Sequence, residues 1–96
     1  MQVRWTEPAA RDLEEISEYI RSDRPAAARH VAQSLFDAAN SLTLLPGRGR
    51  MGRIPGTREL IVVGLPYIIV YKISDAAIHV LRIYHGARKW PADRAR

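Results

Sequence analysis

The hydrophobic period of the chain changes at a glycine- and proline-rich segment, residues 46–57, which holds four glycines and two prolines in twelve positions. Before this segment, apolar residues recur every three or four positions, as in helices. After it, β-branched and aromatic residues form short runs, as in strands. The segment itself is predicted to be a basic loop. Because 96 residues have room for one hydrophobic core, the sequence predicts a single α+β domain over residues 1–96.

Two helices are expected before the loop. Thr6, Glu7 and Pro8 supply a capping hydroxyl, an early acid and a first-turn proline, so a helix is predicted over about 7–22. Pro25 interrupts it, and a second helix is predicted over about 25–45, which makes an antiparallel helical hairpin. The apolar positions that predict its buried face are Ala9, Leu13, Ile16 and Ile20, then Ala28, Val31, Leu35, Ala38, Leu42 and Leu45.

Four extended segments are expected around this hairpin, a short strand over 2–5 and three more over about 58–63, 67–73 and 77–85. The last three are joined by turns and predict an antiparallel meander, with the helices packed on one face of the sheet. Residues 86–96 follow as a basic tail.

The last strand carries apolar residues at Ile78 and Val80 on one face, and at Leu81 and Ile83 on the other. A strand covered on both faces is expected inside the sheet, not at its edge. Large aromatic side chains anchor small cores, and Tyr19 and Trp5 are therefore expected to pack the helical hairpin against the sheet.

The charge of the chain is unevenly distributed. The net charge is +5, yet residues 7–23 hold six acids against two arginines, while residues 24–58 hold six arginines against one acid. A basic surplus favours polyanionic partners such as nucleic acid or an acidic protein. The acids of the first helix are predicted to face water; they are Asp12, Glu14, Glu15 and Glu18.

Several classes of site and location are disfavoured. With no cysteine the chain forms neither a disulfide nor a thiolate metal site, and no histidines and carboxylates have metal-ligand spacing, so we expect no metal and no cofactor. The chain matches the G-x-G-x-x-G pattern of dinucleotide sites at Gly47, Gly49 and Gly52. That pattern must follow a strand and open a helix, whereas here it follows a predicted helix and precedes predicted strands, so we do not expect a dinucleotide site. The N-terminus lacks the apolar core of a signal peptide and no run approaches the ~18 apolar residues of a spanning helix, so we expect a cytoplasmic protein without a membrane partner.

The order of these segments and the motifs within them resemble those of the ParE/RelE superfamily of bacterial toxins. The residues that carry the resemblance are W-T-E-P-A-A-R-D-L-E-E-I at the first helix, the G-R-M-G-R loop, G-T-R-E-L, P-Y-I-I-V-Y and the closing L-R-I-Y-H-G-A-R-K-W-P. The resemblance implies a β-α-α-β-β-β fold and a toxin that forms a hetero-oligomer with a cognate acidic antitoxin. It also implies one of two targets, messenger RNA on the ribosome or DNA gyrase.

The nuclease branch of this superfamily implies catalysis by cationic and acid–base side chains. RNA cleavage needs charge neutralisation at the phosphate and proton transfer at two oxygens, and the candidates here are Arg82, His85 and Arg88. Nuclease members usually carry an arginine where this sequence has Ile68, which cannot neutralise phosphate. Alternation along the strand also directs Arg82 and His85 to opposite faces. A structural role for His85 stays equally open.

The ParE branch matches better at these positions, because it has an aliphatic residue where Ile68 stands. The sequence therefore favours binding to DNA gyrase without catalysis, with a ribosome-dependent mRNA endonuclease as the alternative. On this interpretation the closing segment is part of a docking surface, since tyrosine, tryptophan and arginine dominate interface energetics. The predicted binding residues are Arg48, Arg50, Arg53, Arg58, Tyr84, Lys89 and Trp90.

Overall fold

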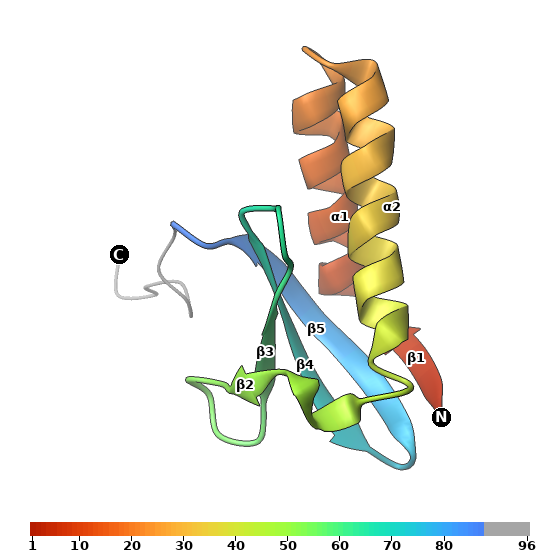
Figure 1. Cartoon of the computed structure of the whole chain (residues 1–96), viewed down its shortest axis with the longest axis vertical. Coiled ribbons are helices and arrows are strands. Elements are labelled where there is room, and N and C mark those ends of the chain that lie inside the picture. The colour runs from red at the N-terminus through yellow and green to blue at the C-terminus, as the bar shows by residue number, and fades with distance from the viewer. Residues whose placement is uncertain (88–96) are drawn as a thin grey trace.

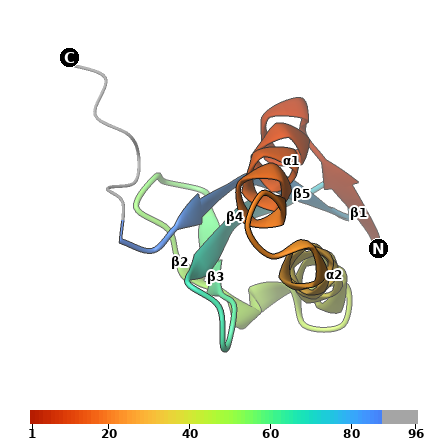
Figure 2. The same ribbon diagram turned by 90° about the horizontal axis from the view of Figure 1, so that it is seen from above.

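The computed structural model describes residues 1–87 and has the predicted α+β architecture. Two antiparallel helices pack on one face of a five-stranded mixed sheet whose strand order is β1-β5-β4-β3-β2 (Figures 1 and 2). In chain order the elements are β1 (Gln2–Trp5), α1 (Glu7–Arg21), α2 (Pro25–Ser41), a 3-10 turn (Pro46–Arg48), β2 (Arg50–Met51), β3 (Arg58–Ile61), β4 (Tyr67–Ser74) and β5 (Ala77–His85).

Thr6 joins the first strand to the first helix and both to β5. Its extended backbone lets the hydroxyl accept a hydrogen bond from the N–H of Ala9, which caps α1 as the sequence predicts. The same hydroxyl donates to the carbonyls of Val80 and Leu81, 3.0 Å from each. The backbone N–H of Thr6 also donates to the carbonyl of Val80. The start of α1 is therefore set against the middle of β5.

The second helix ends at Ser41, so the prediction that it continues to residue 45 is wrong at its C-terminal end. Three successive N–H groups from Leu42 onward donate to carbonyls three residues back, which tightens the chain into turns. The hydroxyls of Ser41 and Thr43 bond nearby carbonyls and favour the same turn. Leu45, predicted to be on the apolar face, is 63% exposed.

The sheet contains the predicted antiparallel meander of β3, β4 and β5, and β1 joins β5 in parallel. The segment 46–57 is not loop throughout, because β2 lies within it and pairs with the first half of β3. β3 ends at Ile61 instead of continuing to 63, since Gly64 adopts a φ of 82° in the turn that leads to β4.

A β-bulge at Leu81 decides which side chains of β5 face the helices. Val80 pairs with Tyr71 and Arg82 pairs with Val70, so Leu81 is an extra residue in β5. The bulge reverses the alternation, and Ile78, Val80 and Ile83 all enter the same core cluster. The prediction that they cover opposite faces is therefore wrong, although β5 does lie inside the sheet, between β1 and β4.

The core lies between the helical hairpin and the sheet, and its largest fully buried side chains include Tyr71, Leu35 and Ile69. Trp5 packs against this core and stacks on Phe36 of α2, with ring centroids 6.2 Å apart, as predicted. Tyr19 does not, because it is 81% exposed on α1. The prediction for Tyr19 is wrong.

The 3-10 turn is fastened to the sheet by Tyr71 and Arg58. The Tyr71 hydroxyl donates to the carbonyl of Pro46 and accepts from the N–H of Gly49, while Arg58 donates to the carbonyls of Gly47 and Gly49. A Cβ at Gly49 would lie 2.7 Å from the Tyr71 ring, whereas a Cβ at Gly47 would meet nothing within 4 Å. The close approach of the chain to Tyr71 therefore requires glycine at position 49.

We expect Gly49→Ala to lower the free energy of unfolding by about 1 to 3 kcal/mol, because the buried Tyr71 ring cannot move aside without strain. Gly47→Ala is the matched control and should change it by less than about 0.5 kcal/mol. Thermal unfolding followed by circular dichroism measures both. Equal stability of the two variants would show that the contact with Tyr71 does not restrict position 49.

Candidate functional site

The carboxylate of Asp12 links α1 to the edge of β5. It accepts hydrogen bonds from Arg82 Nε at 2.7 Å, from a terminal nitrogen of Arg82 at 3.0 Å and from the N–H of Ile83 at 2.9 Å. This contact begins where β1 stops, since β1 pairs with β5 only as far as Val80. The hydrogen bond from Arg82 to Asp12 raises the pKa of the guanidinium, so Arg82 is a cation already matched by an acid.

The sequence analysis placed Asp12 in water, and the structure shows it buried. The spacing held a signal for this, because Asp12 is three residues after Ala9 and four before Ile16, on the apolar side of the helix. An acid at such a position needs a buried partner. That partner comes from β5, seventy residues away in the chain, and no local pattern identifies it.

A second buried carboxylate lies on the face of the sheet opposite the helices, called here the outer face. Leu60, Ile69 and Ile83 form one paired row in the helix-facing core, so the alternate residues of the same strands face outward. By alternation the outward-facing positions of the three strands are Glu59, Ile61, Ile68, Val70, Arg82 and Tyr84, although the Arg82 guanidinium reaches Asp12 of α1 beside the edge of β5.

Glu59 is 1% exposed and is surrounded by donors. One carboxylate oxygen accepts from Arg50 at 2.9 Å, the other accepts from the N–H of Arg53 at 3.1 Å, and the Tyr84 hydroxyl lies 3.5 Å away. Burial opposes ionisation of Glu59, but the hydrogen bonds from Arg53 and Arg50 outweigh it and the pKa is lowered. Conversely, burial and the nearby Glu59 charge raise the pKa of Tyr84.

The predicted binding residues are distributed as follows. Arg50, Tyr84 and the backbone of Arg53 converge on Glu59. Arg48 donates to Ser41 at 2.7 Å and Arg58 donates to carbonyls of the 3-10 turn, so both hold the segment after α2. Lys89 and Trp90, together with the catalytic candidate Arg88, lie outside the described residues.

Of the catalytic candidates, Arg82 and His85 belong to opposite faces of β5, as expected from their spacing. His85 packs edge-on against Tyr67, with ring centroids 5.6 Å apart, and its Nδ1 accepts from the N–H of Ala87 at 3.0 Å. The neutral ring therefore carries its proton on Nε2. Arg82 is directed to Asp12, so these two side chains serve different contacts.

His85 lines a groove between α1 and the ends of β4 and β5, called here the α1 groove, with a volume of about 670 Å³. Its lining residues are Asp12, Glu15, Ile16 and Tyr19 from α1, Tyr67 from β4, and Ile83, Tyr84, His85 and Ala87 from β5 and the turn after it. The sequence analysis placed Asp12 and Glu15 in water, because acids on a helix are ordinarily solvated.

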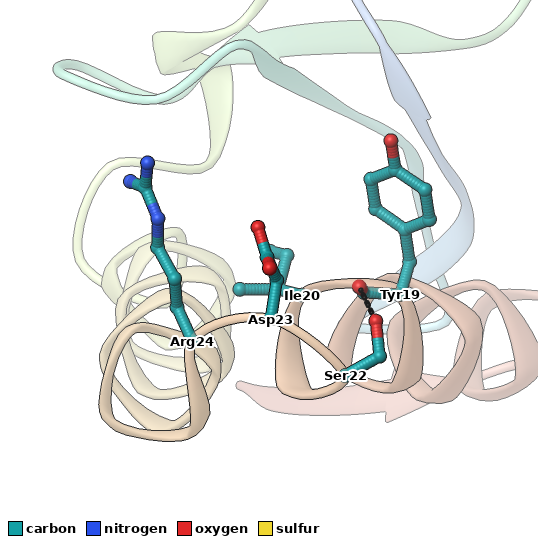
Figure 3. Close-up of a pocket in the computed structure, with 5 residues that line it drawn as sticks. All are labelled: Tyr19, Ile20, Ser22, Asp23 and Arg24. Atoms are coloured by element: carbon teal, nitrogen blue, oxygen red, sulfur yellow. Dashed lines mark hydrogen bonds between the residues drawn. The ribbon is translucent and has the colours of Figure 1, made fainter.

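A smaller hollow of about 410 Å³ lies at the tip of the helical hairpin and shares Tyr19 with the α1 groove. Figure 3 shows Tyr19, Asp23 and Arg24 extending to the same side of the turn, while Ser22 bonds the carbonyl of Tyr19 at 2.9 Å. Within residues 1–87 no group of three potential metal ligands gathers, and no helix there is long and apolar enough to cross a membrane.

Comparison with known proteins agrees with the fold. A sequence model described as the ParE toxin of the type II toxin-antitoxin system, parDE, matches residues 3–90. Toxin RelE2 of Caulobacter vibrioides is 45% identical over 87 residues, which cover 91% of this chain and 97% of that protein.

Solved structures of two toxin-antitoxin systems have the same fold as this chain. The chromosomal ParDE TA system from P. aeruginosa superposes with a TM-score of 0.83 at 27% identity, over 88% of this chain and 95% of that one. The toxin-antitoxin complex RelBE2 from Mycobacterium tuberculosis gives 0.59 at 26% identity, over 88% of each chain. The architecture is that of the ParE/RelE superfamily of type II toxins. Within it, this chain belongs to the ParE toxin family, which confirms the resemblance found in the sequence.

We expect Asp12→Ala to lower the free energy of unfolding by about 2 to 3 kcal/mol, because it leaves the N–H of Ile83 without its acceptor and Arg82 without its acid. Glu14→Ala, two residues away on the exposed side of the same helix, should be nearly neutral. Chemical denaturation of both variants measures the difference. A small loss for Asp12→Ala would mean that water replaces the carboxylate at no cost.

The lowered pKa of Glu59 predicts a pH dependence of stability. Its contribution is fully present above the ordinary glutamate value of about 4.3 and is lost as the pH falls through the lower folded-state value. Glu59→Gln should cost about 2 kcal/mol at pH 7 and lose less stability than the natural protein below pH about 4. Urea unfolding at several pH values tests this, and parallel pH curves would contradict it.

Proposed function

We propose that this protein inhibits growth by binding a protein target, DNA gyrase, and that a cognate antitoxin neutralises it by forming a complex. The antitoxin partner is supported by the solved ParDE and RelBE2 systems, in which the similar chain belongs to a toxin–antitoxin pair. The choice of a protein target rests on the chemistry of the outer face.

The observation that carries this proposal is the aliphatic character of the outer face. Ile61 and Ile68 occupy one paired row, and Val70 lies in the next row beside the buried Glu59. Stabilising a scissile phosphate needs preorganised cations. An aliphatic side chain supplies none, and an ionised glutamate repels the phosphate.

The arginines near this face already have acceptors. Arg82 is bound by Asp12, Arg50 by Glu59, and Arg58 by two backbone carbonyls. Recruiting any of them to RNA would leave a buried carboxylate or carbonyl group unsatisfied. The described residues thus leave few cations for a scissile phosphate, which favours a protein target over RNA cleavage.

The alternative, a ribosome-dependent mRNA endonuclease, is favoured by one observation. The half-buried His85 ring is held against Tyr67 and lines the α1 groove, and an imidazole in such a place can serve as a general acid or base. Arg82 and His85 do not share a face, so the catalytic assignment of Arg82, His85 and Arg88 remains a proposal within this alternative.

DNA supercoiling by purified gyrase, assayed with increasing amounts of the protein, tests the proposal. We expect inhibition near stoichiometric amounts, and unchanged supercoiling at large excess would refute it. Mapping of transcript 5′ ends in cells after a pulse of expression tests the alternative, since new ribosome-dependent cuts would establish the nuclease.

A variant separates the two mechanisms. His85→Gln should leave growth arrest within about threefold of the natural protein if the target is gyrase, whereas loss of a general acid or base costs about a hundredfold or more. His30→Gln, on the exposed side of α2, is the control for expression. Growth arrest is measured as the inducer concentration that halves the growth rate.

A further inference from the structure

Three basic side chains lie side by side on the outer face of the sheet. Arg4 of β1 pairs with His79 of β5, and His79 pairs with Lys72 of β4. Val3 and Ile78, next to them along the strands, pack in or against the core, so the three side chains point away from the helices. They are called here the basic row. Its two ends are about 10 Å apart, because neighbouring strands are separated by about 4.8 Å.

The cations of the basic row are unmatched within the described part of the chain. Arg4 and Lys72 are exposed, and no ion pair found there involves either of them. Arg4 donates from Nε to the neutral amide of Gln2, 3.1 Å away. Glu59, on the neighbouring outward-facing row, is already bound by an arginine, and Asp75, in the turn after β4, forms no ion pair. An anion over the basic row is therefore attracted by both ends without displacing an acid.

The next row on the same face supplies polar groups. Gln2, Ala77 and Ser74 are paired across the same three strands, two positions further along each of them. The amide and the hydroxyl of this second row can donate to phosphate oxygens. The Nε2 of His79 donates to the carbonyl of Ser74 at 3.3 Å, so its ring is bound to the strand. Contact with an anion therefore falls mainly to the two longer basic side chains.

The basic row is separate from the catalytic candidates. Lys72 is four residues after Ile68 in β4, which is about 13 Å along the strand. His85 lies at the far end of β5 from His79. The row therefore supplies no cation to a phosphate bound beside Ile68 or His85, since exposed charges that far apart are largely screened at physiological salt.

The composition of the two rows favours a duplex phosphate backbone over other partners. Protein interfaces centre on aromatic and large apolar anchors, and single-stranded nucleic acids stack their bases on aromatic rings. Neither row holds a phenylalanine, a tyrosine, a tryptophan or a large aliphatic residue. Cations with polar donors beside them are what contacts to a duplex backbone require.

We propose that the basic row binds the phosphate backbone of duplex DNA, with Arg4 and Lys72 on phosphates and with Gln2 and Ser74 donating beside them. The choice of DNA rests on the proposed function, because duplex DNA is the substrate of gyrase. The contact is independent of base sequence, since every base pair presents the same phosphates. The row thereby brings the protein to the substrate of its target.

The experiment uses the purified full chain and a fluorescein-labelled DNA duplex of about 20 base pairs, with binding followed by fluorescence anisotropy at several salt concentrations. The logarithm of the association constant falls with the logarithm of the salt concentration by about 0.9 for each phosphate contacted. A single strand and an RNA duplex of the same length are measured under the same conditions. NMR chemical-shift titration with the DNA duplex locates the contact on the protein.

We expect Lys72→Gln and Arg4→Gln each to weaken binding of the DNA duplex about tenfold at about 50 mM salt, and to lower the salt slope by about 1. Arg29→Gln removes the same charge from an exposed position on α2, which packs on the opposite face of the sheet, and should weaken binding less than about threefold. Thermal unfolding verifies that all three variants fold.

Four outcomes would overturn the proposal. They are equal weakening by Lys72→Gln and Arg29→Gln, chemical shifts centred on the loop 46–57 or after Ala87, tighter binding of the single strand or the RNA duplex, and no measurable binding of the DNA duplex. None of these measurements uses gyrase. Inhibition of gyrase without DNA binding would thus remove this inference alone, whereas DNA binding without inhibition would remove the proposed function and leave the basic row as a DNA contact.

Discussion

The arrangement of this protein depends on the contact between the Asp12 carboxylate and the edge of β5. β1 covers that edge only as far as Val80, and beyond it the N–H of Ile83 would be buried without an acceptor. Asp12 supplies the acceptor from α1 and so replaces the missing strand. Because Thr6 fixes the start of the helix on the same strand, the two contacts together set how α1 lies over the sheet, and hence the shape of the α1 groove.

Several arginines of this basic chain hold the fold together. Arg82 and Arg50 are matched by the two buried carboxylates, and Arg58 closes the 3-10 turn through backbone carbonyls. A positive net charge therefore does not by itself make a phosphate site. What decides the matter is whether cations converge on a surface without acceptors of their own, and on the outer face aliphatic residues stand beside Glu59 instead.

Local sequence patterns predicted the helical hairpin, the meander and the inner position of the last strand, because each depends on periodicity and on proline or glycine nearby. They failed where pairing, turns or a bulge that the hydrophobic period does not reveal decided the structure. β2 forms because Arg50 can pair with Glu59, and α2 stops before Leu45 because turns close there. Tyr19 stays exposed although its large ring favours burial. The bulge at Leu81 has no local signature at all.

The sequence by itself determined the α+β class, the toxin superfamily and the absence of an arginine at position 68, since all of these are written in residue order and spacing. Only the tertiary structure decided which charges are already matched and which remain available. The reason is that neutralisation depends on distance in space: Asp12 and Arg82 are seventy positions apart in the chain, yet their side chains lie 2.7 Å apart in the structure.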